Sequence, residues 1–451
     1  MNSQQLIKDL EAICSDFEID PNVLKKSMNL EFFSEYISQV STDKFQYDAI
    51  LKPKDYSEIK KIIQYANEKE IPIIPKGGGN SLAGQLFPSN GGFLLDLSKF
   101  NKIEEINFAD RYAIVECGVT IEQLIPLLMK NGFYFPPSFN NYKKLTIGGL
   151  IGNNVSNSYR FYTSNYILGL EIILSNGDII NTGSKTLKNV SGYNISSLFI
   201  GSEGSLGVVL KAILKIDPIP TNLRIIMLDS PQITTLIDWF QDNWKEQEIN
   251  YIKIIQENLK EKHTYQLIIE TIDQKIENLK TKLTNLQLLK TFEIYSYSDF
   301  QENIYSNTFK ELIKEKPLIF GFKTFIGNTN KFLIEIEKYI DTFQLNLKLD
   351  ITIINQTSYF VLIISHHTID DMKKIIKMRL KLLDTIKTLG DGLIPDFGLS
   401  LWNQMLFDDD QKLQHNYKDQ IKSVFDPKNI LNPKNYSSKE TKILVDLIEN
   451  I

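Results

Sequence analysis

The sequence predicts a mixed α and β protein of more than one domain, in which an α/β part is followed by an α+β part on an antiparallel sheet. At 451 residues the chain is too long for a single compact core. Segments with strand and helix patterns alternate over residues 45–135, which is typical of a small α/β unit. Over residues 221–390, long amphipathic helices lie between apolar strands, which is typical of an α+β domain with an antiparallel sheet.

The first part of the chain shows its elements through hydrophobic spacing. Residues 55–70 carry isoleucines at helical spacing, and the apolar run IPIIP that follows predicts a short buried strand. Further strands are expected over residues 91–103 and 112–120, and a helix over residues 121–132.

Residues 146–216 differ in composition, because they are rich in Gly, Asn and Ser and contain only short strands. The motif SNGD at residues 175–178 predicts a hairpin with a two-residue turn. The motif DPIP at residues 217–220 interrupts the pattern and predicts a domain boundary.

The bulk composition excludes several classes of function. The net charge is −5 and no basic stripe is present, which argues against nucleic acid as the main partner. The two cysteines, Cys14 and Cys117, are too few and too far apart to hold an iron–sulfur cluster. No stretch approaches the ~20 apolar residues of a membrane span, and the N-terminus resembles neither a signal nor a transit peptide. We therefore expect a cytoplasmic protein, soluble or peripheral to the inner membrane.

Three consecutive glycines, Gly77 to Gly79, follow the buried strand and precede Asn80 and Ser81. Bare N–H groups in succession form a concave nest that attracts phosphate, although a plain connecting loop would also explain the glycines. The loop departs from the dinucleotide-binding fingerprint, because Leu82 stands where the third glycine belongs.

Three later segments strengthen the nucleotide interpretation. Residues 135–158 combine a Pro-Pro turn, a threonine, a glycine pair and an Asn/Ser run, which together offer the donors that a diphosphate needs. Residues 188–216 place Gly201, Gly204 and Gly207 before a strand, where either close approach to a flat ring or a bulged hairpin would need them. The C-terminal DPKNILNP supplies Asn432.

This ordered set of motifs resembles the FAD-linked oxidase family of the vanillyl-alcohol-oxidase (PCMH-type) fold, and within it the D-lactate and D-2-hydroxyglutarate dehydrogenases and the glycolate oxidase flavin subunits. The matching motifs run from residue 72 to 216 and return at 426–433. The resemblance implies a PCMH-type FAD-binding domain of two α/β subdomains and an α+β cap domain on an antiparallel sheet. The expected domains are residues 1–217 for FAD binding, 218–392 for the cap, and 393–451 for a segment returning to the FAD domain.

The resemblance also assigns FAD-binding residues, with Lys76 at a position where arginine is usual. They are Pro75, Lys76, Gly77, Gly78, Gly79, Asn80, Ser81, Pro137, Ser138, Thr146, Gly148, Gly149, Asn154, Ser156, Glu203, Gly204, Gly207, Val208 and Asn432. No histidine or cysteine lies within these segments, so FAD is expected to be bound without a covalent link.

The family's metal ligands have no match here. Tyr359 and Phe360 fall near the expected histidine pair, and Asp396 stands about where a further histidine is expected. His366 and His367 are adjacent on a strand, so their side chains point to opposite faces and we expect no metal site. Asp396 is the candidate catalytic base, with a capping aspartate as the structural alternative, and Lys323 is the candidate contact for a substrate carboxylate, with a surface lysine as its alternative.

Two functions remain open on this sequence. The first is an FAD-dependent dehydrogenase that oxidises a 2-hydroxy acid or a related alcohol by hydride transfer to flavin N5 and passes electrons to a separate subunit or a soluble acceptor. The second is a catalytically altered flavin-binding subunit of a larger oxidoreductase complex. The missing metal ligands favour this second function, but the first still leads, because the flavin-binding segments are complete and the resemblance includes active relatives without the metal.

Overall fold

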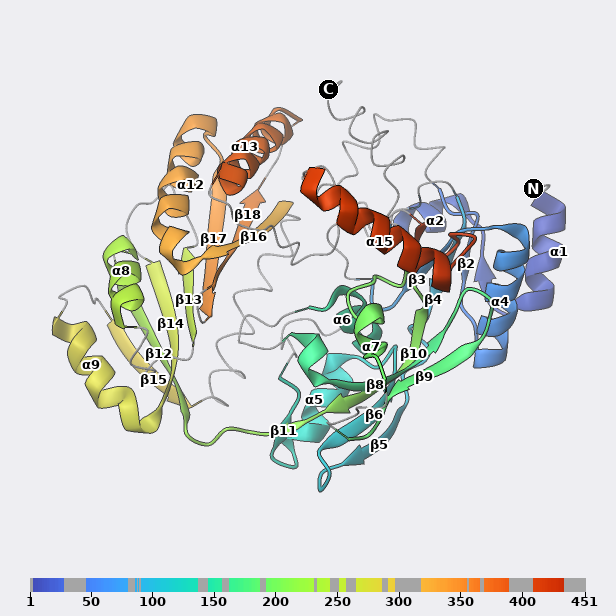
Figure 1. Ribbon diagram of the computed structural model, residues 1–451, viewed down its shortest axis with the longest axis horizontal. Helices are drawn as coiled ribbons and strands as arrows, with labels where there is room; N and C mark the ends of the chain where they lie inside the picture. Colours follow the sequence, from blue (N-terminus) through green and yellow to red (C-terminus); the bar gives the residue numbers. More distant parts are fainter. Residues whose placement is uncertain are drawn as a thin grey trace. The chain divides into compact units, whose positions relative to one another are not determined.

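The computed structural model describes residues 3–27, 46–79, 86, 88, 91–136, 145–155, 162–186, 192–230, 233–243, 251–256, 265–285, 291–296, 318–354, 357–365, 369–388 and 409–433. The chain divides into two compact units (Figure 1). Unit 1 contains residues 1–157, 161–218 and 397–451, and unit 2 contains residues 158–160 and 219–396. As the sequence predicts, the fold combines a unit that contains a mostly parallel α/β sheet with a unit on a large antiparallel sheet.

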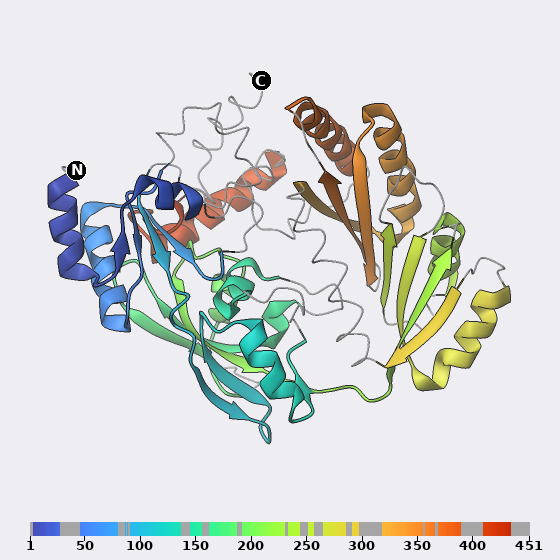
Figure 2. The ribbon, with the colours of Figure 1, turned by 180° about the vertical axis from the view of Figure 1, so that it is seen from behind.

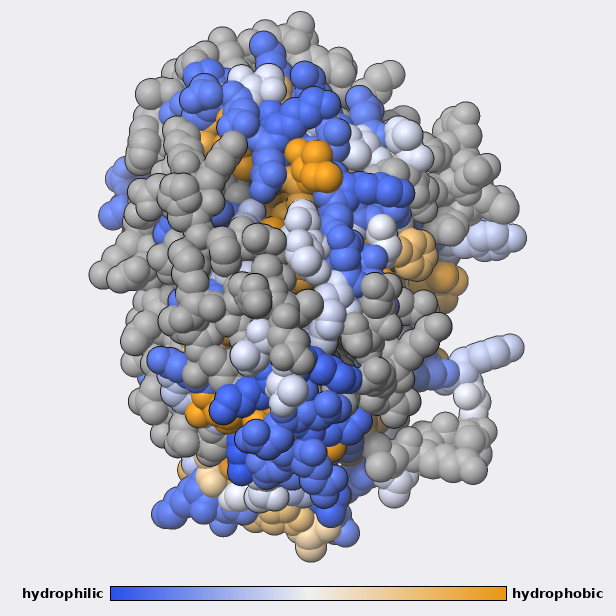
Figure 3. Space-filling view, turned by 90° about the vertical axis from the view of Figure 1, so that its left-hand side faces the viewer, coloured by the Kyte–Doolittle hydropathy of each residue, from blue (hydrophilic) through white to orange (hydrophobic). Residues whose placement is uncertain are grey.

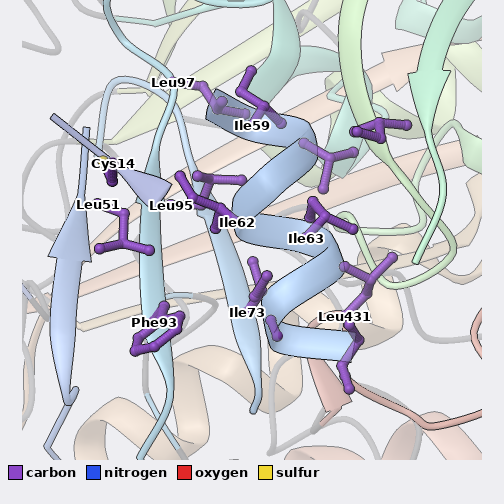
Figure 4. Close-up of a cluster of buried hydrophobic side chains, with 14 of the residues drawn as sticks. Cys14, Leu51, Ile59, Ile62, Ile63, Ile73, Phe93, Leu95, Leu97 and Leu431 are labelled. Atoms are coloured by element: carbon purple, nitrogen blue, oxygen red, sulfur yellow. The ribbon is translucent and has the colours of Figure 1, made fainter. Parts of the chain in front are cut away.

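The first subdomain of unit 1 is a four-stranded sheet in the order β1-β2-β4-β3, parallel except for β1. Helix α4 packs its isoleucines against this sheet, and Figure 4 shows Ile59, Ile62 and Ile63 beside Leu95 and Ile73. The elements are α1 (Ser3–Ile13), β1 (Phe17–Glu18), α2 (Pro21–Ser27), β2 (Ala49–Leu51), α4 (Tyr56–Lys69), β3 (Ile73–Lys76) and β4 (Phe93–Asp96).

The second subdomain is a five-stranded antiparallel sheet in the order β5-β6-β10-β8-β9. Its apolar face packs against α5 and α6 through residues such as Leu124 and Leu150. The elements are β5 (Ile103–Asn107), β6 (Tyr112–Glu116), α5 (Ile121–Met129), β7 (Phe133–Tyr134), α6 (Ile147–Asn153), η3 (Thr163–Tyr166), β8 (Ile167–Ile173), β9 (Ile179–Gly183), α7 (Ser196–Phe199), β10 (Val208–Lys215) and β11 (Asp217–Pro218).

Helix α15 (Asp409–Phe425) and the residues after it complete unit 1. Leu431 forms a parallel bridge with Ile73 of β3 and joins the same hydrophobic core, where Figure 4 labels it. Residues more than 350 positions apart in the sequence therefore lie at one sheet edge.

Unit 2 is built on a seven-stranded antiparallel sheet in the order β15-β12-β14-β13-β17-β18-β16. The described helices of this unit lie along one face of the sheet, as both ribbon views show (Figure 2), and the coloured residues on the side seen in Figure 3 are mostly hydrophilic. The elements are β12 (Leu223–Ser230), α8 (Ile233–Asn243), β13 (Tyr251–Gln256), β14 (Tyr265–Ile272), η5 (Asp273–Lys275), α9 (Ile276–Asn285), β15 (Thr291–Ser296), β16 (Leu318–Phe325), η6 (Ile326–Asn328), α12 (Thr329–Phe343), β17 (Asn346–Ile354), β18 (Thr357–Ser365) and α13 (Ile369–Thr388).

Two expectations from the sequence are wrong in detail. The predicted α/β unit of residues 45–135 ends earlier, because β5 and β6 pair with β10 rather than with the first sheet. The SNGD hairpin has a three-residue loop, since the backbone N–H of Leu174 donates to the carbonyl of Asp178 and Gly177 takes a positive φ of 86°. In both cases the local pattern predicts the strands but does not specify their partners or the closing pair. None of the described helices is long and apolar enough to cross a bilayer.

Candidate functional site

The glycine loop leaves the carboxyl end of β3, which is parallel to β4. Lys76 and Asp96 are paired across these strands, and the Lys76 ammonium lies 2.6 Å from the Asp96 carboxylate. Burial opposes the charge on Asp96, but hydrogen bonds from Lys76 and Ser98 outweigh it and hold the pKa of Asp96 below its usual value. An ion pair therefore supports the loop where it begins.

Thr146 connects the glycine loop to the second predicted segment. Its hydroxyl caps helix α6 by accepting a hydrogen bond from the N–H of Gly149 (3.2 Å) and also accepts one from the N–H of Gly78 (3.3 Å). A Cβ on Gly77 would lie 2.2 Å from this hydroxyl oxygen, so no other residue fits without displacing Thr146. Gly79 has a φ of +73°, which favours glycine for a second reason.

The turn of residues 201–205 lies against both β3 and α6. The N–H of Glu203 donates to the carbonyl of Gly152 (2.8 Å), and the N–H of Gly201 donates to that of Ile151 (2.9 Å). A Cβ on Gly204 would lie 2.4 Å from Cγ of Pro75, and Gly204 has a positive φ of 75°. The third predicted segment therefore meets the start of the glycine loop directly.

Asn432 reaches the same turn from the C-terminal segment. Its backbone N–H donates to the carbonyl of Ile73 (2.8 Å), and its side-chain N–H donates to the carbonyl of Glu203 (2.8 Å). The residue is 2% exposed, yet its Oδ1 has no hydrogen-bond partner in the part of the chain that the structure describes. An unpaired buried carbonyl oxygen is costly, so this atom is available to a donor from a bound molecule.

Four predicted residues have roles within the fold itself. Gly148 and Gly207 allow close packing, since a Cβ on each would lie about 3 Å or less from Cys117 and from Ile172 respectively. Asn154 ends α6 with a left-handed φ of 43°, and its side chain accepts a hydrogen bond from Ser164. Val208 is buried in the first core cluster.

Several predicted residues lie outside the described residues. They are Asn80, Ser81, Pro137, Ser138, Ser156 and Asp396, and also His366 and His367. Lys323 lies in β16, paired in register with Tyr359 of β18, but its side chain is not among those described.

Sequence reasoning missed three charged residues around the site, namely Asp96, Lys422 and Asp426. Asp96 is the last residue of β4 and the only charged residue of that strand, so it could have been suspected as a partner for Lys76. The four-residue spacing of Lys422 and Asp426 predicts a helical ion pair but not its burial.

Neither cysteine is suited to bind a flavin covalently. Cys14 and Cys117 are both buried and unpaired. Burial and, to a lesser extent, the neighbouring Glu116 raise the pKa of the Cys117 thiol to about 12, so the nucleophilic thiolate is scarce at neutral pH.

Residues 47–183 match the family model described as an FAD binding domain. The chain therefore contains a domain of this FAD-binding type. It is 39% identical over 184 residues to the glycolate oxidase subunit GlcD of Bacillus subtilis, which covers 40% of this chain and 39% of that protein. It is 36% identical over 185 residues to a D-lactate dehydrogenase of Archaeoglobus fulgidus, and this match covers 40% of this chain and 41% of that protein. It is 32% identical over 200 residues to a D-2-hydroxyglutarate dehydrogenase of Stutzerimonas stutzeri, and this match covers 43% of each protein. These matches span about two fifths of each relative.

Two solved structures share the fold of this chain over nearly its whole length. A structure of p-cresol methylhydroxylase with substrate bound matches 96% of this chain and 96% of its own, with a TM-score of 0.77 and 16% identity. A 4-ethylphenol oxidase from Gulosibacter chungangensis matches 96% and 97%, with a TM-score of 0.76 and 15% identity.

The residues present fit FAD. The glycine loop has no side chains that would keep a diphosphate away from its backbone, and the buried Oδ1 of Asn432 suits a donor on the flavin or its ribityl chain. Among the described side chains, no group of three or more His, Cys, Asp or Glu could hold a metal ion.

Proposed function

We propose that the protein is an FAD-dependent oxidoreductase that dehydrogenates a 2-hydroxy acid or a related alcohol, with non-covalently bound FAD and without the family's metal site. The observation that carries this proposal is the FAD-binding domain. Its three relatives named above are named for glycolate, D-lactate and D-2-hydroxyglutarate, all of which are 2-hydroxy acids. When bound, FAD supplies the acceptor for the hydride that leaves the substrate carbon.

The protein's own residues bind and orient the cofactor in this proposal. The backbone of Gly77 to Gly79, with Asn80 and Ser81, would hold the diphosphate, while Thr146 fixes the loop. Asn432 would accept a hydrogen bond from the flavin portion.

The metal-free part of the proposal is supported by Phe360. This residue stands near an expected metal-ligand position, but it is fully buried in β18 and stacks on Phe322 with 4.7 Å between ring centroids. Its ring is part of the unit 2 core, so this position offers no ligand. Activity should therefore survive treatment with chelators.

Asp396 is the proposed general base for the substrate hydroxyl proton, and Lys323 the proposed cationic contact for the substrate carboxylate. An Asp396→Asn variant keeps the shape of the side chain and removes the base, so flavin reduction should slow by ~10²–10⁴-fold. Rapid-mixing measurement of flavin bleaching checks this, with Asp409→Asn on α15 as a matched control. Unchanged reduction in the Asp396 variant would show that the base lies elsewhere.

The function itself is tested by anaerobic titration of the FAD-loaded protein. A panel of 2-hydroxy acids in both configurations, with sugars and lactones beside them, is added and the flavin absorbance is followed. Bleaching by at least one 2-hydroxy acid or related alcohol is the expected result. The proposal is wrong if FAD is bound and dithionite bleaches it but no member of the panel does.

That negative result would favour a second function, a flavin-binding subunit of a larger oxidoreductase complex. Two observations support this alternative: the apolar Phe360 at a metal-ligand position, and the similarity to a protein that is itself named as a subunit.

A further inference from the structure

Helix α15 ends in a buried ion pair between Lys422 and Asp426. The two side chains are 8% and 0% exposed, and the ammonium contacts the carboxylate directly. Burial lowers the pKa of Lys422, and the negative charge of Asp426 opposes that shift. Buried pairs of this kind add little net stability, because desolvation of both charges offsets their attraction. The pair therefore calls for an explanation other than stability.

The ammonium joins two parts of unit 1 that are far apart in sequence. Besides Asp426, Lys422 Nζ donates to the carbonyl of Ser205 at 2.6 Å and to the carbonyl of Leu431 at 2.7 Å. All three of its donors are thus used. One acceptor lies in the turn of residues 201–205, and the other belongs to the peptide bond that leads into Asn432.

The carboxylate of Asp426 shapes the segment between the helix and Asn432. It accepts hydrogen bonds from the N–H groups of Ile430 (3.1 Å) and Leu431 (2.7 Å). Within this segment Asn429 and Asn432 adopt left-handed conformations, with φ of 53° and 39°. Asparagine adopts this conformation more readily than other residues with a side chain, and the hydrogen bonds to Asp426 stabilise the segment in which both asparagines lie.

Lys422 and Asn432 therefore form two parallel cross-links between the same segments. The lysine links Ser205 to Leu431, and the asparagine amide links Glu203 to position 432. The carbonyl of Leu431 that Lys422 contacts belongs to the peptide bond before Asn432, and the buried Oδ1 of Asn432 has no partner among the described residues.

We propose that Lys422 is a positioning residue for FAD, which acts by fixing Asn432 so that its Oδ1 meets a donor of the bound cofactor. This inference rests on the proposed assignment of Asn432 to the FAD site. It makes docking of the C-terminal segment and binding of FAD mutually dependent, although Lys422 itself need not touch the cofactor.

The test is a double-mutant cycle on the full chain, in which apoprotein is titrated with FAD. Lys422→Met should raise the Kd for FAD at least tenfold and change the visible absorbance and circular dichroism of bound flavin toward those of Asn432→Ala. In the Asn432→Ala background, Lys422→Met should change the Kd by less than about threefold, because its effect passes through the asparagine.

The matched control is Lys428→Met. Lys428 anchors the same segment at the surface, through the carbonyl of Asn67 (3.0 Å) and through Glu70 (3.6 Å). This variant should keep the wild-type Kd and flavin spectrum.

Lys422→Met leaves Asp426 buried alone and could unfold the chain, so the cycle is repeated with Lys422→Met/Asp426→Asn, in which neither charge remains. The inference is overturned if either folded variant binds FAD with wild-type Kd and spectrum and only the melting temperature of the apoprotein falls. It is equally overturned if the Lys422 and Asn432 effects add. Failure of the wild-type chain to bind FAD would instead contradict the proposed function.

Discussion

The two sides of the candidate FAD site are built in opposite ways. On the glycine-loop side, Gly77 to Gly79 carry no side chains, and one threonine hydroxyl and one partly exposed ion pair support their backbone. On the C-terminal side, the buried side chains of Lys422, Asp426 and Asn432 stabilise a segment that contains two residues in the left-handed conformation. The glycine-loop side requires residues without side chains, whereas the C-terminal side requires charged and polar side chains. Substitutions should therefore affect the two sides differently.

On the glycine-loop side, Gly77→Ala should have the largest effect on both stability and FAD affinity. The new methyl group would lie 2.2 Å from Thr146 Oγ1, and overpacking of this kind costs about 1–3 kcal/mol in the free energy of unfolding. The methyl group would also force the backbone of the glycine loop out of its place beside Thr146, which removal of the hydroxyl alone would not do, so FAD affinity should fall by roughly two orders of magnitude, about 2.7 kcal/mol. Thermal unfolding of the apoprotein and FAD titration measure the two effects.

Gly327→Ala is the control for this substitution, because no atom of the described residues lies within 4 Å of a Cβ there. Wild-type FAD affinity in Gly77→Ala would show that Thr146 moves aside without consequence and that the loop does not depend on it.

The ion pair between Lys76 and Asp96, at the start of the glycine loop, should make the free energy of unfolding depend on pH. The pKa of Asp96 is lowered in the folded protein from its usual 3.8, so its contribution to stability is present above that value and is lost as the pH falls below it. Asp96→Asn should therefore cost about 1–3 kcal/mol at neutral pH, and the difference from wild type should shrink below pH ~4. Urea unfolding across that range measures it, and a difference independent of pH would rule out the ionised carboxylate as its source.

The smallest effect is expected from Thr146→Ala, which removes a helix cap but leaves the glycines in place. Loss of an N-cap hydroxyl typically costs about 1 kcal/mol, and Thr146→Ser should recover most of it. FAD affinity should fall less than tenfold in the alanine variant. A loss as large as that of Gly77→Ala would mean that the hydroxyl binds the cofactor directly instead of supporting the loop.

The same contrast explains which parts of the site the sequence could predict. The glycine loop and the Asn-Pro motif could be predicted from the sequence, because a backbone that must be free of side chains requires glycine at specific positions. The elements of the fold were visible through the spacing of residues such as Ile59 and Ile62, which face one core. The type of sheet in unit 2 also follows from its alternation of strands and amphipathic helices.

Contacts between distant segments could not be predicted in this way. Asp96, Lys422 and Asp426 are ordinary charged residues in the sequence, and only the tertiary fold removes them from water. The pairing of β6 with β10 is equally invisible, since nearly 100 residues separate them and local pattern carries no record of a partner. The bridge between Ile73 and Leu431 is the extreme case.

That bridge bears on how the protein is made. During synthesis, the ribosome releases β3 and the glycine loop long before it adds Leu431, so the edge of the first sheet remains uncovered while the whole of unit 2 emerges. Pairings of such high sequence separation form late and slowly. An exposed parallel edge on a nascent chain is a site of misassembly. We therefore expect a copy truncated before residue 426 to aggregate more readily than the full chain.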